Sequence, residues 1–230
     1  TKAGPYAVAV ENPALFFGRL LRNALIKEGI GVRGEVRESQ KPEDCEFRPV
    51  IEHTTTIGDC LVRTNKDSFG LAAEAMFKRL GIQSDPNEKQ GSWAGGRKVL
   101  AGYLRGLGVD EREFVISDGS GLSRDNRLSA NVLTLVLMHL SAGPDWEFYK
   151  SSLAVGGYDG TIENHFWEKP YRGRVLAKSG YIHAVRALSG VILTEKGEYL
   201  FSILANRAGS GARTAIDNAV KAVIDWASRS

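Results

Sequence analysis

Three closely spaced β-type runs near the C-terminus most constrain the fold of this chain. They cover 173–178, 183–193 and 199–206, and the last two are joined by the hairpin-like turn "TEKGE". Strands with such short connections run antiparallel, because a parallel crossover needs a dozen or more residues. We therefore expect an antiparallel sheet in this part of the chain.

Helical patterns precede and follow this sheet. The first is the clearest, because Asn12 can cap it, Pro13 suits its first turn and Gly29 can end it. Short strands are expected at 30–38 and 46–56, and another at "REFVIS". This order predicts an α+β fold, an antiparallel sheet with helices packed against it. The expected helices are 12–29, 57–66, 69–81 (stopped by Gly81), 94–108, 131–140 and 212–228.

Composition and charge exclude two classes of partner. Of the 230 residues, 43% are hydrophobic and 25% are charged, as in an ordinary globular protein. The net charge is only +3 and the basic residues form no stripe, which argues against nucleic acid. No segment approaches the roughly 20 apolar residues that span a bilayer, so we expect no transmembrane segment. The first residues also lack the pattern of a signal peptide.

The sequence indicates neither a metal site nor an organic cofactor. Its four histidines are dispersed, and two cysteines without a nearby histidine pair do not make a zinc site. Cys45 and Cys60 could form one disulfide, or both could be free thiols. Neither lies beside a histidine or at an evident helix start, so neither is expected to be a nucleophile.

A lysine, a serine and a glycine interrupt the first strand of the sheet. Lys178 can hold a carboxylate, Ser179 can donate a hydrogen bond, and Gly180 lets a ligand approach the backbone. A lysine at a strand edge can equally serve only to discourage aggregation.

Two other polar spots lie at the ends of predicted elements. Ser68 falls at a helix start, where it could act chemically or simply cap the helix. The loop "SDGSGLSRDN" crowds Asp118, Ser120, Ser123 and Asn126 around two glycines. Such a loop can cradle a substrate, although these side chains usually satisfy the backbone of their own turn.

Taken together and in order, these segments resemble the class C, low-molecular-mass penicillin-binding proteins, the D-alanyl-D-alanine carboxypeptidases of the S13 serine peptidase family. The resemblance covers almost the whole chain. The segments that carry it are "NPALFFGRLLRNALIKEGIGVRGEV", "NKDSFGLAAEAMFKRLG", "SDGSGLSRDNRLSA", "VGGYDGTIENHF" and "AKSGYIHAVRALSGVIL".

The resemblance implies serine-type acyl transfer in a penicillin-binding (transpeptidase-like) fold. In the family, an S-x-x-K serine attacks the carbonyl of the penultimate D-alanine, and an S-x-N serine helps move the proton to the leaving amine. A K-T-G strand lies antiparallel to the substrate, binds its carboxylate and contributes to the oxyanion hole. By this correspondence Ser68 and Lys178 are catalytic, and Ser179, Gly180, Tyr181 and Gly70 bind substrate, with Ser179 in place of the threonine.

The chain departs from the family pattern at two places. Gly70 stands where the family has the S-x-N asparagine, so the side chain that holds the substrate amide is missing, and Asn126 is one candidate to replace it. In addition, no serine in the 230 residues is followed three residues later by lysine. The nucleophile is therefore not in this sequence.

The second departure leaves two interpretations open. In the first, residues 1–230 are the C-terminal part of a penicillin-binding/transpeptidase-like domain, incomplete at its N-terminal side, and belong to a carboxypeptidase that could also be an endopeptidase. Its implied partners are peptidoglycan stem peptides ending in D-Ala-D-Ala and β-lactam antibiotics, in the periplasm or another extracytoplasmic site. In the second, the chain is a degenerate relative that binds peptidoglycan or a partner protein without catalysis. A third class, an unrelated α+β domain, would require the order of the motifs to be a coincidence.

Overall fold

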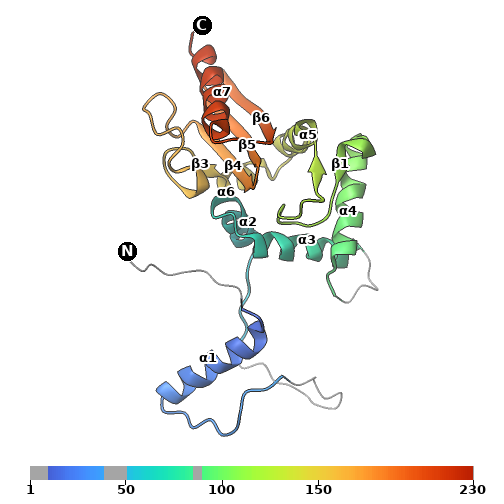
Figure 1. Ribbon diagram of the computed structural model, residues 1–230, viewed down its shortest axis with the longest axis vertical. Helices are drawn as coiled ribbons and strands as arrows, with labels where there is room; N and C mark the ends of the chain where they lie inside the picture. Colours follow the sequence, from blue (N-terminus) through green and yellow to red (C-terminus); the bar gives the residue numbers. More distant parts are fainter. Residues whose placement is uncertain (1–9, 39–50, 85–89, 230) are drawn as a thin grey trace. The chain divides into compact units, whose positions relative to one another are not determined.

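The computed structural model describes residues 10–38, 51–84 and 90–229. By their internal contacts the residues of the chain form two units, Thr1–His53 and Thr54–Ser230. The site lies in the second unit, and each unit is described by itself (Figure 1).

The described part of the first unit contains one helix, α1 (Pro13–Lys27). It begins as expected, because the Asn12 side chain accepts a hydrogen bond from the Leu15 amide at 2.9 Å and a proline occupies the first turn. Gly29 follows its end with a φ of +80°, a left-handed conformation that glycine adopts without strain.

The strand expected at 30–38 is wrong, because the structure assigns no strand to these residues. For the strand expected at 46–56, residues 46–50 lie outside the described residues and 51–56 are not a strand. An alternating pattern alone does not make a strand without a partner to pair with.

The second unit is built on a four-stranded antiparallel sheet in the order β3-β4-β5-β6. This confirms the expected α+β class. The two-residue turn between β5 and β6 pairs Thr194 with Gly197, as the "TEKGE" segment predicted. The strands are β3 (Ala154–Val155), β4 (Val175–Ile182), β5 (Val185–Thr194) and β6 (Gly197–Asn206).

Helices pack on both faces of this sheet, so β4 is buried on two sides at its start. On one face, Val175 and Ala177 pack with the apolar stripe of α7 (Ala212–Ala227). On the other face, Leu176 packs with Trp146 of α6 (Trp146–Ser152). Because side chains alternate along a strand, Lys178 follows Leu176 to the second face, and Ser179 follows Ala177 to the α7 face.

The remaining helices form a lobe beside the sheet (Figure 1). Its elements agree with the sequence patterns, except that α3 continues past Gly81 and that α6, β2 and β3 were not expected. The strand expected at "REFVIS" is present as the two-residue strand β1. The elements are α2 (Ile57–Lys66), α3 (Gly70–Ser84), α4 (Trp93–Gly106), η1 (Glu111–Glu113), β1 (Phe114–Val115), β2 (Arg127–Leu128), α5 (Ala130–Ser141) and, in the loop after β3, η2 (Gly160–Ile162).

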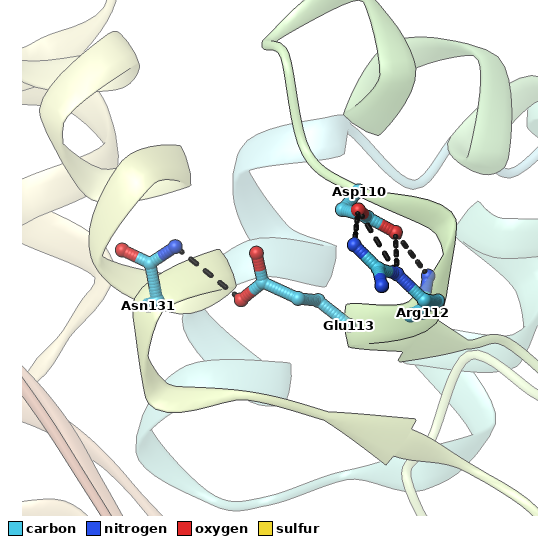
Figure 2. Close-up of polar contacts among 4 residues, drawn as sticks. All are labelled: Asp110, Arg112, Glu113 and Asn131. Atoms are coloured by element: carbon cyan, nitrogen blue, oxygen red, sulfur yellow. Dashed lines mark hydrogen bonds and ion pairs between the residues drawn. The ribbon is translucent and has the colours of Figure 1, made fainter.

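Glu113 ties η1 to the start of α5 (Figure 2). Its carboxylate accepts hydrogen bonds from the Ser129 hydroxyl at 2.6 Å and from the Asn131 amide at 3.3 Å. Asp110 and Arg112 form a separate ion pair of 2.6 Å on the same turn. The Glu113 contacts therefore join the segment before β1 to the segment after β2.

Candidate active site

The structure brings Lys178 and Ser68 together. The Lys178 ammonium donates a hydrogen bond to the Ser68 hydroxyl at 2.9 Å and a second one to the Ser179 carbonyl. Partial burial lowers the pKa of Lys178, because burial penalises the charged form. An amine with a lowered pKa can exchange a proton with a neighbouring hydroxyl more readily at neutral pH.

Ser68 lies in a three-residue turn between α2 and α3 and does not cap a helix. Its φ of 55° is in the left-handed region, which costs a non-glycine residue about 1 kcal/mol. The turn is held because the Phe69 amide donates to the Arg63 carbonyl at 3.1 Å. Strain of this kind often marks functional sites, since the surrounding structure must maintain it.

Two polar contacts fix the end of α2 that carries this turn. The Asn65 amide donates to the Ser152 hydroxyl at 2.7 Å, and both side chains are buried. Lys66 forms a 2.5 Å ion pair with Asp159 in the loop after β3. Although burial alone would raise the pKa of Asp159, hydrogen bonds from Lys66 and from the Val155 amide lower it. The contacts therefore position Ser68 relative to the sheet.

A cleft of about 490 Å³ opens beside Ser68. Ser179, Gly180 and Tyr181 of β4, which are predicted to bind substrate, line it, whereas Lys178 is not among its lining residues. The other residues that line it are Thr161, His165, Arg186, Ala187, Leu188, Arg213, Ile216 and Asp217.

The β4 edge at this cleft has no strand paired with it among the described residues. Within the described part of the chain, β3 pairs with β4 only through Ala154↔Ala177 and Val155↔Leu176. From Lys178 to Ile182, β4 is paired on its β5 side alone. Unpaired strand edges can bind a further strand through backbone hydrogen bonds.

The loop 117–126 packs against α3 and satisfies its own polar groups. Glu74 of α3 accepts hydrogen bonds from the Ser120 hydroxyl at 2.7 Å and the Gly119 amide at 3.2 Å. Burial alone would raise the pKa of Glu74, but these bonds and one from Trp93 lower it. Asp118 accepts from the amides of Gly121 and Ser123 in the same way.

Asn126 does not replace the missing asparagine of the S-x-N motif. Its amide nitrogen donates to Asp118 at 2.6 Å, and its oxygen accepts from the Ser117 amide at 2.7 Å. Both ends of the side chain therefore serve the loop. Gly70 begins α3, and a Cβ there would lie 3.3 Å from the Ser120 Cβ, so it faces the loop; it is not among the residues that line the cleft.

Most of the other residues that line the cleft were not predicted from the sequence. His165 and Asp217 form a hydrogen-bonded pair at 2.9 Å between their Nδ1 and Oδ1 atoms, and their side chains are 13% and 15% exposed. Thr161 accepts a hydrogen bond from Ser179 at 2.7 Å. Among these residues, only Arg186 stands out in the sequence, as a charged residue within the otherwise apolar strand pattern "HAVRALSG".

Among the described residues, no cluster of three or more histidine, cysteine, aspartate or glutamate side chains could hold a metal ion. Cys60 is half-buried on α2, and Cys45 lies outside the described residues. Across the parts of the chain that the structure describes, none of the helices combines the length and the apolar character needed to cross a bilayer.

This chain is similar to known proteins over most of its length. The model of the D-Ala-D-Ala carboxypeptidase 3 (S13) family matches residues 1–228. The D-alanyl-D-alanine carboxypeptidase of Actinomadura sp. (strain R39) is 33% identical over 218 residues, which cover 92% of this chain and 40% of the relative. DacB of Haemophilus influenzae is 25% identical over 193 residues, with 83% and 40% covered. The chain thus spans about 40% of the length of these relatives.

The fold of the chain also matches a solved structure. Penicillin-binding protein 4 of Haemophilus influenzae, in complex with a β-lactam, superposes with a TM-score of 0.76 at 22% identity. The superposition covers 95% of this chain and 52% of the solved chain. At this identity the likeness shows the fold.

Proposed function

This chain belongs to the D-Ala-D-Ala carboxypeptidase 3 (S13) family, and from that premise we propose that it forms the substrate-recognition part of a serine-type D-Ala-D-Ala carboxypeptidase. Residues 1–230 then correspond to the C-terminal part of a penicillin-binding (transpeptidase-like) domain. The substrates are peptidoglycan stem peptides ending in D-Ala-D-Ala, and β-lactams occupy the same cleft. Because peptidoglycan lies outside the cytoplasm, the proposed location is periplasmic or otherwise extracytoplasmic.

The observation that carries this proposal is the 2.9 Å contact between Ser68 and Lys178 beside the free edge of β4. A peptide that pairs with this edge would run along the cleft past the Ser68 hydroxyl. Its backbone would be held by β4, and its reacting bond would lie close to a hydroxyl and an amine that share a proton.

The side chains have distinct roles in this proposal. Ser68 relays a proton to the leaving amine, and Lys178 keeps the Ser68 hydroxyl oriented and exchanges the proton with it. Ser179 and Tyr181 contact the peptide, and Gly180 allows its backbone to approach. Acyl transfer also needs a serine nucleophile from an S-x-x-K motif, which these 230 residues do not contain.

Labelling with a fluorescent penicillin tests the proposal. The 230-residue chain should bind the penicillin reversibly and acquire no covalent label, and it should not hydrolyse acyl-D-Ala-D-Ala. Supplying a family segment that carries S-x-x-K, in trans or by fusion, should restore labelling. Covalent labelling of the chain alone would contradict the assignment of roles, and no reversible binding of either ligand would contradict substrate recognition.

Gly70 favours a second candidate function, a relative that binds peptidoglycan without catalysis. With glycine in the position of the S-x-N asparagine, one contact to the substrate amide is lost. The same labelling experiment separates the two functions, because a non-catalytic relative binds the peptide yet stays unlabelled and inactive even when the S-x-x-K segment is supplied.

A further inference from the structure

The cations around the cleft differ in how many of their donors are free. The Lys178 ammonium already donates to Ser68 and to the Ser179 carbonyl, and Lys178 does not line the cleft. Two of its three N–H groups are therefore in use. Arg186 and Arg213 do line the cleft, and an arginine guanidinium carries five N–H donors and stays charged.

Arg186 is placed beside the segment of β4 that a peptide would meet. It is directly opposite Tyr181 in the β4–β5 register, so both side chains project from the α7 face, as Ser179 does. The guanidinium lies 3.7 Å from the centre of the Tyr181 ring. One of its nitrogens, Nη1, donates to the Val185 carbonyl at 3.0 Å. These contacts place the group beside Tyr181, and no described contact uses its Nε and Nη2 atoms.

We propose that Arg186 binds the terminal carboxylate of the ligand in this cleft. This inference rests on the proposed function and moves the anion-binding role from Lys178 to a residue of the neighbouring strand. A guanidinium fork fits a planar carboxylate through two parallel hydrogen bonds. Lys178 then remains free to act on Ser68, so substrate anchoring and proton transfer use different cations.

Arg213 is less suited to this role because of its surroundings. Its Nη2 atom donates to the Asn164 carbonyl at 3.1 Å, and its side chain starts one turn before Asp217 on α7. Asp217 supplies the one carboxylate among the described residues that line the cleft. A ligand carboxylate at Arg213 would approach that negative charge, and like charges repel.

Binding of two matched peptides to the 230-residue chain tests the inference. The probes are N-acetyl-D-Ala-D-Ala as the free acid and as the C-terminal amide, measured by calorimetry or NMR titration. The chain should bind the acid about tenfold more tightly, the scale of a charged hydrogen bond. Arg186→Gln should remove this preference by weakening the acid about tenfold and leaving the amide unchanged.

Arg213→Gln is the matched control, since it removes the same charge from the same cleft and should keep the preference for the acid. Arg186→Lys keeps the charge without the fork and should give an intermediate preference, which also covers the case that Arg186→Gln does not fold. A preference that persists in Arg186→Gln, or is lost in Arg213→Gln instead, would overturn the inference. Equal binding of both peptides by the unaltered chain would overturn it but not the proposed function, and binding of neither would contradict both.

Discussion

The Lys178 ammonium lies 2.9 Å from the Ser68 hydroxyl, although the two residues are 110 positions apart in the sequence. The contact joins the middle of β4 to the turn between α2 and α3. It places a partly buried amine against a hydroxyl that lines the cleft.

Replacing the ammonium by an apolar chain should change how the stability of the fold depends on pH. Burial lowers the pKa of Lys178 below its ordinary value of 10.5, so the folded state binds this proton less strongly than the unfolded state. The penalty is full below the folded-state pKa and disappears as the pH rises towards 10.5. In urea unfolding, the free energy of unfolding of Lys178→Met should therefore fall relative to that of the unaltered chain between pH 7 and pH 10.

Ser68→Ala is the control for that comparison, because it removes the hydrogen-bond partner of the Lys178 ammonium. Ser68→Ala keeps the amine and removes its partner, so it should be less stable than the unaltered protein at pH 7. A constant difference between Lys178→Met and the unaltered chain from pH 7 to 10 would contradict the lowered pKa.

Glu74 should stabilise the loop 117–126 through its charge. Hydrogen bonds from Ser120, Trp93 and Gly119 outweigh burial and lower the pKa of Glu74 below its ordinary 4.5. This stability is present above pH 4.5 and is lost as the pH falls through the lowered pKa. Glu74→Gln should cost about 1 kcal/mol at pH 7, because the site is only partly buried. Denaturation at pH 3 should show a smaller difference, and an unchanged one would contradict the prediction.

Gly119 should tolerate no side chain. A Cβ there would lie 2.4 Å from the Phe77 Cβ and 2.8 Å from the Ala73 carbonyl oxygen. Gly119→Ala should therefore destabilise the second unit by about 1–3 kcal/mol through overpacking. The matched control is Gly102→Ala in α4, where a Cβ meets nothing within 4 Å. That change should stabilise by about 0.5–1 kcal/mol, so equal thermal midpoints for the two variants would contradict the close approach.

A side chain at position 70 should leave peptide binding unchanged, because this position faces the loop 117–126 and does not line the cleft. A Cβ there would meet the Ser120 Cβ at 3.3 Å, so Ser120 must shift by a few tenths of an ångström. Gly70→Asn and Gly70→Ala should therefore bind N-acetyl-D-Ala-D-Ala as tightly as the unaltered chain does. A gain of about fivefold for Gly70→Asn alone, the scale of one neutral hydrogen bond, would contradict this placement of position 70.

Local signals predicted the long elements well and the short ones poorly. The three β runs became β4, β5 and β6, and the helical patterns at 57–66, 94–108 and 131–140 became α2, α4 and α5 within about two residues. The strand expected at "REFVIS" became the shorter β1, whereas the two-residue strands β2 and β3 were not predicted, because two residues are too few to show a hydrophobic period. Apolar and polar residues alternate over 30–38, but the structure assigns no strand to these residues.

By itself the sequence determined the types of the long elements and, through the order of its motifs, the family. Only the tertiary structure decided which polar groups face one another. Lys178 and Ser179 are neighbours in the chain, yet the pleat of β4 directs one to Ser68 and the other to the cleft, where Arg186 of β5 is held against Tyr181. The physical reason is that local propensity fixes the backbone of an element, whereas the partner of a charged side chain depends on how the elements pack.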